Sequence, residues 1–109
     1  MKAALLCLSL AGCGSMTAAP EGWPELTRTE VLNVGVGEVA KICADTFAPL
    51  ACAHVDLCTL TCTTYYQSGM YLQFIRDHED GHCNGSDHVG ETTFADLLAL
   101  WKTGKACPQ

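Results

Sequence analysis

The sequence predicts a small α+β domain, held together by disulfides, with a short sheet, a histidine-bearing helix and a C-terminal helix. Three observations support this prediction. The run 59–66 is rich in β-branched and aromatic residues, which is typical of a strand. Two later segments, 69–83 and 92–102, repeat apolar residues at helical spacing. Finally, six cysteines follow the first 13 residues, an even number in a short chain.

The first half of the chain predicts two strands and a short helix. Apolar side chains alternate over residues 31–36, which favours a strand there. A short helix is expected over 38–44, because its apolar residues fall on one side. The clearest strand is 59–66, which holds four threonines and two tyrosines.

Two longer helices are expected in the second half. Ser68 is expected to cap the first of them, and Asn84-Gly85 should end it. One face of this helix should pass from apolar residues to imidazoles: Tyr71, Ile75, His78 and His82. The last helix, 92–102, has Thr92 as its expected cap and Gly104 just past its end. Its expected buried stripe consists of Phe94, Leu97, Leu98 and Trp101.

The N-terminus reads as a secretory signal. One lysine precedes an apolar run and then small residues, and the run is too short to span a bilayer as a mature helix. The stretch Leu10-Ala11-Gly12-Cys13 resembles the bacterial lipobox. That resemblance implies a signal peptide over 1–12, acylation of Cys13 and a lipidated tether over 13–24. Gly14 after the cysteine favours the outer membrane, facing the periplasm. The alternative is an ordinary soluble secretory signal cleaved nearby.

Removing residues 1–12 from the 109 leaves 97, which is enough for one small domain and not two. A domain of this size buries a modest core, so cross-links contribute much of its stability. In an oxidising compartment the six remaining cysteines predict three disulfides. These residues are Cys43, Cys52, Cys58, Cys62, Cys83 and Cys107. A cysteine metal site is the alternative, although no C-x-x-C pair occurs, and the pairing stays open among fifteen possibilities.

The charge of the chain argues against nucleic acid as a partner. Beyond residue 12 the sequence has five Lys and Arg against twelve Asp and Glu, a net charge of −7 with neutral histidines. A surface this acidic repels a phosphate backbone.

The most specific motif starts at residue 78. It reads His78-Glu79-Asp80-Gly81-His82-Cys83-Asn84-Gly85-Ser86-Asp87-His88, which fits H-E-x-x-H-x-x-G-x-x-H. Histidines four residues apart project from one helix face and can share a metal ion. Glu79 can then take a proton from metal-activated water without being a ligand. Gly85 lets the helix stop, so that the chain can turn back and present His88 as a third ligand. We therefore expect one Zn²⁺ per chain. The alternative is a solvated helix end whose histidines bind no metal.

These eleven residues resemble the metzincin zinc-peptidase signature. The first eight also resemble an H-E-x-G-H-C-N-G element of small secreted bacterial proteins. The resemblance implies that His78, His82 and His88 are metal ligands and that Glu79 is the general base. It also implies that the strand 59–66 offers its edge to the substrate backbone. The chain departs from the family in having no methionine after Met70, where metzincins place one beneath the metal.

Other residues around the motif bear on the expected reaction. An oxyanion stabiliser would have to come from Tyr65, Tyr66 or Tyr71, the only phenols in the chain. The carboxylates of Asp77, Asp80 and Asp87 could form an acidic rim that favours a basic substrate segment, or could simply be solvated.

Together these observations predict a membrane-anchored zinc metallopeptidase of the bacterial cell envelope. Its metallopeptidase-like domain should span residues 25–109, with the zinc-binding helix at its centre, and it should act on a peptide or protein substrate. Two alternatives remain open. One is a zinc-binding envelope lipoprotein without turnover, and the other is a disulfide-rich interaction module whose motif binds no metal.

Overall fold

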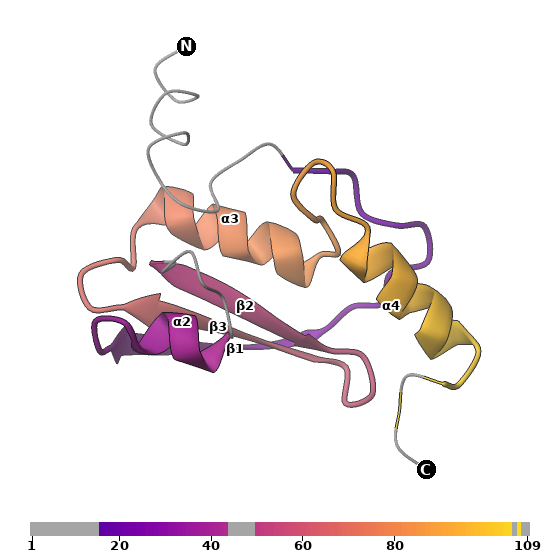
Figure 1. The fold of residues 1–109 in the computed structure, drawn as a ribbon, viewed down its shortest axis with the longest axis horizontal. Coiled ribbons are helices and arrows are strands. Elements are labelled where there is room, and N and C mark those ends of the chain that lie inside the picture. Colours follow the sequence, from indigo (N-terminus) through magenta and orange to yellow (C-terminus); the bar gives the residue numbers. More distant parts are fainter. Residues whose placement is uncertain (1–15, 44–49, 106, 108–109) are drawn as a thin grey trace.

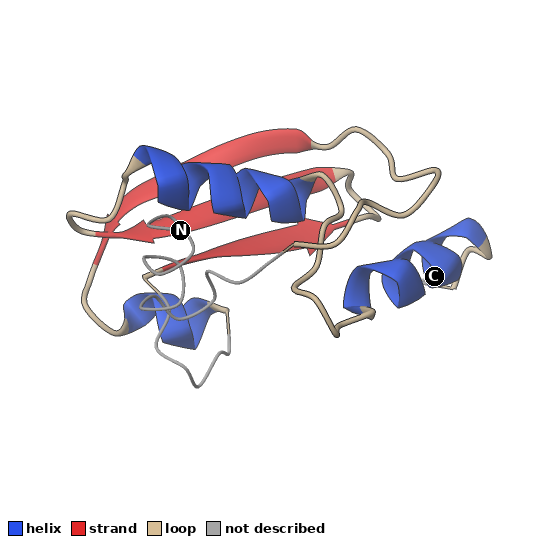
Figure 2. Cartoon of the chain, turned by 90° about the horizontal axis from the view of Figure 1, so that it is seen from above, coloured by secondary structure: helices blue, strands red, loops and turns tan. Residues whose placement is uncertain are grey.

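The computed structural model describes residues 16–43, 50–105 and 107. A three-stranded sheet forms the centre of the domain, in the order β1-β3-β2 (Figure 1). The strands are β1 (Thr27–Val34), β2 (Ala51–Asp56) and β3 (Thr61–Gln67). Helix α3 (Gln73–Cys83) lies along one face of the sheet (Figure 2). The predicted α+β class is confirmed, whereas residues 1–12 and Cys13 lie outside the described residues.

Strand β3 is the central strand and confirms the strand expected near 59–66. It pairs in parallel with β1 and antiparallel with β2. Its side chains alternate in burial, and Cys62, Thr64 and Tyr66 point to the face covered by α3. In the antiparallel register, Ala51 lies opposite Tyr66 and Ala53 opposite Thr64. Two small alanines on that face of β2 leave room for α3 to lie close to the strand.

Strand β1 begins earlier than expected. The alternation over 31–36 suggested a strand there, but the register shifts between Val31 and Val34, and the strand ends at Val34. Asn33 in this shift has φ 58°, a left-handed conformation that asparagine tolerates better than most residues. Such a bulge bends an edge strand and ends its pairing.

Helix α3 presents Ile75, Glu79 and Cys83 to the sheet, one residue per turn. The expected face of the helix is therefore rotated, because His78 and His82 flank this buried row instead of belonging to it. The expected Ser68 cap is wrong, since Leu72 is the N-cap residue and makes no side-chain capping bond. Tyr71 is 36% exposed and is not part of the core.

The other two helices lie at opposite ends of the sheet. The short α2 (Glu38–Ile42) confirms the described part of the expected helix and buries Val39. Helix α4 (Thr93–Lys102) confirms the last expected helix and buries Leu98. Thr92 makes no capping bond, and the carboxylate Oδ2 of Asp87 instead accepts the Phe94 N–H at 2.9 Å. A carboxylate at a helix N-terminus satisfies an orphan N–H and complements the helix dipole.

All six expected cysteines form disulfides, in three pairs: Cys43–Cys52, Cys58–Cys107 and Cys62–Cys83. The third pair joins β3 to the last turn of α3 through the buried core. The first pair joins the C-terminal end of α2 to β2 on the opposite face of the sheet. Among the described residues, no helix combines the length and the apolar character needed to cross a bilayer.

Candidate metal centre

The turn that ends α3 sets up the site. Ser86 N–H donates to the Gly81 carbonyl at 2.9 Å, and Gly85 N–H donates to the His82 carbonyl at 3.0 Å. This pair of bonds is a Schellman motif, in which the residue after the C-cap adopts positive φ. Gly85 has φ 96°, and a Cβ there would lie 2.7 Å from the Trp23 ring. Both the conformation and the space therefore require glycine, as the motif predicted, and the chain turns back toward the helix.

The three histidines of the motif converge. The Nε2 atom of His78 lies 3.1 Å from that of His88 and 3.2 Å from that of His82. A ligand nitrogen from each ring lies within 4.8 Å of the others, and each residue is partly buried. The helix supplies two imidazoles, and the returning loop supplies the third. The three histidines of the sequence motif therefore lie close together in the structure.

Two of these rings are oriented by oxygen atoms behind them. The Nδ1 atom of His82 lies 2.8 Å from the Ser86 carbonyl oxygen. The Nδ1 atom of His88 lies 3.1 Å from a carboxylate oxygen of Glu91. An oxygen at Nδ1 fixes the proton there and leaves the Nε2 lone pair for a metal, as is usual for histidine ligands. Sequence analysis missed Glu91, although a carboxylate three residues after a candidate ligand was an available signal.

The electrostatics of the site favour the neutral form of the His78 and His82 rings. Burial and, to a lesser extent, the neighbouring His82 and His88 lower the pKa of His78 to about 4. Burial also lowers the pKa of His82, although its bond to the Ser86 carbonyl acts in the opposite direction. Neutral imidazole is the form that binds a metal, so the lowered pKa values of His78 and His82 favour cation binding near neutral pH. Three imidazole nitrogens are a ligand set that suits Zn²⁺ and leaves a fourth position open.

Glu79 lies one residue from His78 and is only 5% exposed. Burial and, to a lesser extent, the negative charge of Asp80 raise the pKa of its carboxyl to about 8. A cation held by the adjacent imidazoles would favour the carboxylate and lower this pKa again. A carboxyl whose pKa lies near neutrality is suited to general acid–base catalysis.

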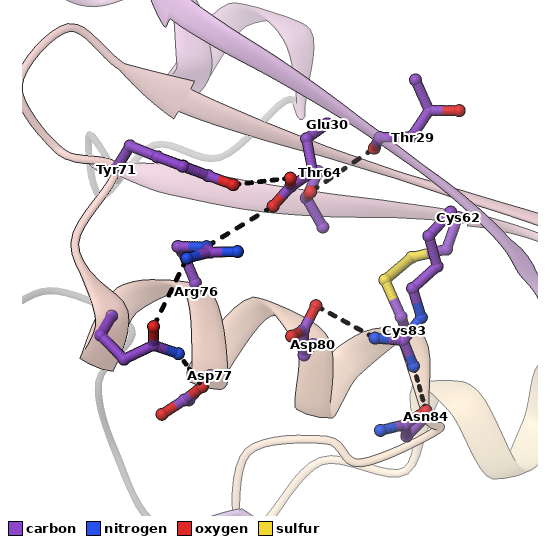
Figure 3. Close-up of polar contacts among 12 residues, drawn as sticks. Thr29, Glu30, Cys62, Thr64, Tyr71, Arg76, Asp77, Asp80, Cys83 and Asn84 are labelled. Carbon is purple, nitrogen blue, oxygen red and sulfur yellow. Dashed lines mark hydrogen bonds and ion pairs between the residues drawn. A yellow bond between two sulfur atoms is a disulfide. The ribbon is translucent and has the colours of Figure 1, made fainter.

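The opposite flank of α3 is tied to β1 by charged side chains (Figure 3). Arg28 pairs with Asp80 at 3.0 Å and also donates a hydrogen bond to Asn84. Arg76 pairs with Glu30 at 3.7 Å. Residues 76, 80 and 84 mark the β1 side of the helix, so His78 and His82 lie on the side away from β1. That is the side of β2, the strand against which α3 packs.

The expected acidic rim is wrong for two of its three residues. Asp80 is engaged with Arg28 on the β1 side. Asp87 is 6% exposed and caps α4. Asp77 is exposed and accepts a hydrogen bond from Gln73 at 2.7 Å. Of the acidic groups, Glu91 makes a direct contact with a histidine of the cluster.

The positions of the three tyrosines do not suit an oxyanion stabiliser at the histidine cluster. The Tyr71 hydroxyl donates to Glu30 at 2.7 Å on the β1 side. Tyr66 is fully buried, and burial raises its pKa to about 12. Tyr65 alternates with Tyr66 along β3 and so points to the other face of the sheet. An oxyanion stabiliser from these phenols is therefore not supported by their positions.

The strand whose edge could pair with a substrate is β2, and not the expected strand 59–66. Strand β3 is paired on both sides and has no free edge, so the expectation for 59–66 is wrong. Strand β2 is at the end of the sheet, on the side of the histidine cluster, and its outer edge has no partner strand among the described residues. A peptide that adds to this sheet beside the histidines would pair with β2.

Comparison with known proteins does not extend the resemblance beyond the motif. No family model, no curated protein and no solved structure matches this chain.

Proposed function

We propose that this protein is a zinc-dependent peptide hydrolase, with His78, His82 and His88 as ligands and Glu79 as general base. The observation that carries the proposal is the convergence of three Nε2 atoms, together with a buried carboxyl at the residue next to His78 on the same helix. The spacing that resembles the metzincin signature is thus accompanied by the geometry that a three-histidine site needs.

The residues of the site divide the chemistry among them. Bound zinc would supply a Lewis acid that polarises a peptide carbonyl and lowers the pKa of a water molecule. Glu79 accepts the proton from the attacking water and then delivers it to the departing amine. Its burial keeps bulk water from solvating the carboxylate, which strengthens its hydrogen bond to a bound water. Glu91 and the Ser86 carbonyl hold His88 and His82 in place during both transfers.

The substrate is a peptide segment in extended conformation. Its backbone pairs with the outer edge of β2 (Ala51–Asp56), beside which the described residues place no other strand. Because the helix flank that carries His78 and His82 is the flank on the β2 side, a peptide on this edge passes close to the metal ligands.

The site belongs to the bacterial cell envelope in this proposal. The lipobox-like stretch before Cys13 supports a lipid anchor, and the three disulfides support an oxidising compartment such as the periplasm. An outer-membrane lipoprotein facing the periplasm meets both conditions.

The test is the substitution Glu79→Gln. The amide fills the same space and can hydrogen-bond a water, but it cannot take up a proton. We expect zinc content and fold to be unchanged and peptide hydrolysis to fall by about a hundredfold to ten-thousandfold, the usual contribution of a general base. Cleavage is measured on a library of flexible peptides by mass spectrometry, and Glu25→Gln is the matched control at an exposed position. Unchanged hydrolysis in Glu79→Gln would contradict the assigned role.

The second candidate is a zinc-binding module without turnover. The small size of the domain favours it, because about a hundred residues leave little surface for a specificity cleft. It would be supported if the wild-type protein binds zinc in a 1:1 ratio and cleaves no member of the library.

A further inference from the structure

The segment that precedes the sheet lies against the loop that carries His88. Figure 1 shows the first described residues running beside the turn after α3. Met16 and His88 form an antiparallel β-bridge. Next to it, the Thr17 N–H donates to the Asp87 carbonyl at 2.8 Å, and the Asp87 N–H donates to Thr17 Oγ1 at 2.9 Å. A threonine at position 17 therefore uses both its backbone and its side chain to hold the residue before the third ligand.

The same segment also contacts the helix that carries the other two ligands. The Met16 side chain lies over Gly81, where a Cβ would come within 2.9 Å of its terminal methyl group. Farther along, the Trp23 indole N–H donates to the Cys83 carbonyl at 2.9 Å. Residues 16–23 thus form a strap across the end of α3 and the start of the returning loop. The strap is fixed at both of its ends.

The loop between α3 and α4 needs such support. It runs from Asn84 to Thr92 and contains Gly85 and Gly90, both with positive φ. Its own hydrogen bonds hold the Asp87 carboxylate at the start of α4 and the His88 ring at Glu91. The N–H groups of Ser86 and Glu91 also hold the backbone on either side of Asp87. None of these bonds involves the Asp87 N–H or carbonyl, and Thr17 bonds to both. A ligand held in place before the metal arrives loses less conformational entropy on binding.

We infer that Thr17 is a positioning residue of the metal centre and that the strap, residues 16–23, completes the site by fixing the loop that presents His88. This inference rests on the proposed zinc site and adds to it a part of the chain that the histidine motif does not contain. Thr17 acts through Asp87 and does not touch the metal. The effect is on affinity and on coordination geometry.

The experiment compares zinc affinity among variants of the complete mature chain. Thr17→Val keeps the branched shape and removes the hydroxyl that accepts the Asp87 N–H, whereas Thr17→Ser keeps the hydroxyl. The matched control is Thr103→Val, which removes a hydroxyl that donates to the Leu100 carbonyl at 2.9 Å, in the turn after α4. Affinity is measured by competition with a chromogenic chelator, and the visible absorption of the Co²⁺-loaded protein reports coordination geometry.

We expect Thr17→Val to weaken zinc binding by about threefold to tenfold, the equivalent of one neutral hydrogen bond, and to alter the Co²⁺ spectrum. Thr17→Ser should bind within about twofold of wild type, and Thr103→Val should match wild type in both readouts. In a His88→Ala background, Thr17→Val should have no further effect, because the ligand that it positions is gone.

Two results would overturn the inference while leaving the zinc site intact. The first is wild-type affinity and an unchanged Co²⁺ spectrum in Thr17→Val. The second is an equal loss of affinity in Thr103→Val, which would mean that zinc binding only follows overall stability. A wild-type protein that binds no zinc would overturn the proposed function as well.

Discussion

At the scale of single residues, His82 and His88 differ in the oxygen atom that contacts their Nδ1. His82 is held by a backbone carbonyl, which no side-chain substitution removes directly. His88 is held by the carboxylate of Glu91, which is half exposed and belongs to a loop. Of these two candidate ligands, His88 is therefore the one whose ring contacts a replaceable side chain. The sequence motif contains only the candidate ligands and base, so it does not include the contact by which Glu91 orients His88.

The first prediction concerns Glu91. Glu91→Ala should lower zinc affinity by about tenfold to a hundredfold, the usual cost of losing a hydrogen-bonded partner behind a metal ligand. Glu91→Gln should lower it less, because the amide oxygen can still accept the Nδ1 proton of His88. Competition with a chelator measures both changes, and Glu38→Gln on α2 is the matched control. Zinc binding as tight as wild type in Glu91→Ala would contradict the role of Glu91 in orienting His88.

At the scale of elements, helix α3 was predicted from sequence because its signals are local. Its C-terminal Asn84-Gly85 signal and the four-residue spacing of His78 and His82 depend on neighbouring residues alone. Its N-terminus was predicted wrongly, because tertiary contacts at Leu72 replaced the capping that Ser68 could have offered. The rotation of its buried face also escaped prediction, since the position of Cys83 depends on its disulfide to a distant strand.

Strand β2 could not be predicted for a related reason. Its sequence, Ala51 to Asp56, contains two alanines, which have low strand propensity, and no clear alternation. It forms a strand because β3 supplies an antiparallel partner and α3 needs a small-residue surface to lie on. The strap at 16–23 escaped prediction because its small and turn-forming residues suggested a tether, while its contacts join residues up to 81 positions apart.

The second prediction concerns the disulfides. In the chain-entropy model, the bridge that closes the longest loop restricts the unfolded chain most. The sequence separation is 49 residues for Cys58–Cys107, 21 for Cys62–Cys83 and 9 for Cys43–Cys52. Paired Cys→Ala variants should lose about 4, 3 and 2.5 kcal/mol of unfolding free energy in that order, before any packing loss. Urea unfolding measures these values.

Cys62–Cys83 carries an additional expectation, because both residues are buried in the core beside α3. Its double Ala variant should exceed the entropic value by the cost of the cavity. A reversed order, with Cys43–Cys52 costing the most, would contradict the loop-length argument. A thiol count on denatured, unreduced protein provides the control, since the described cysteines should yield no free thiol.

At the scale of the whole molecule, the domain has two small cores and three disulfides. One core lies between the sheet and α4, around Leu57, Cys62 and Leu98. The other lies under the start of α3, around Tyr66 and Ile75. Neither is large, so disulfides between elements provide stability that burial alone would not. The candidate metal centre lies at the end of α3 near the first core, where the strap, the loop and the helix meet.

The third prediction concerns the anchor. Cells that express the full chain should incorporate a fatty-acid analogue at Cys13, and Cys13→Ser should abolish the label. Label that persists in Cys13→Ser would refute lipidation at this residue. Met16 is the third residue after Cys13, and an extended chain spans at most about 11 Å over that length. An anchored protein would therefore hold its metal centre next to the membrane surface, within reach of membrane-proximal peptide segments.

The most direct test of the central claim is the zinc content of the mature protein after removal of metal with a chelator and reconstitution near neutral pH. Elemental analysis should give one zinc per chain for the wild type, and far less for His82→Ala and for His88→Ala under the same competition with chelator. His54→Ala, at an exposed histidine on β2, is the matched control and should retain one zinc. A wild-type protein without zinc, or a His82→Ala variant with undiminished zinc, would contradict the account.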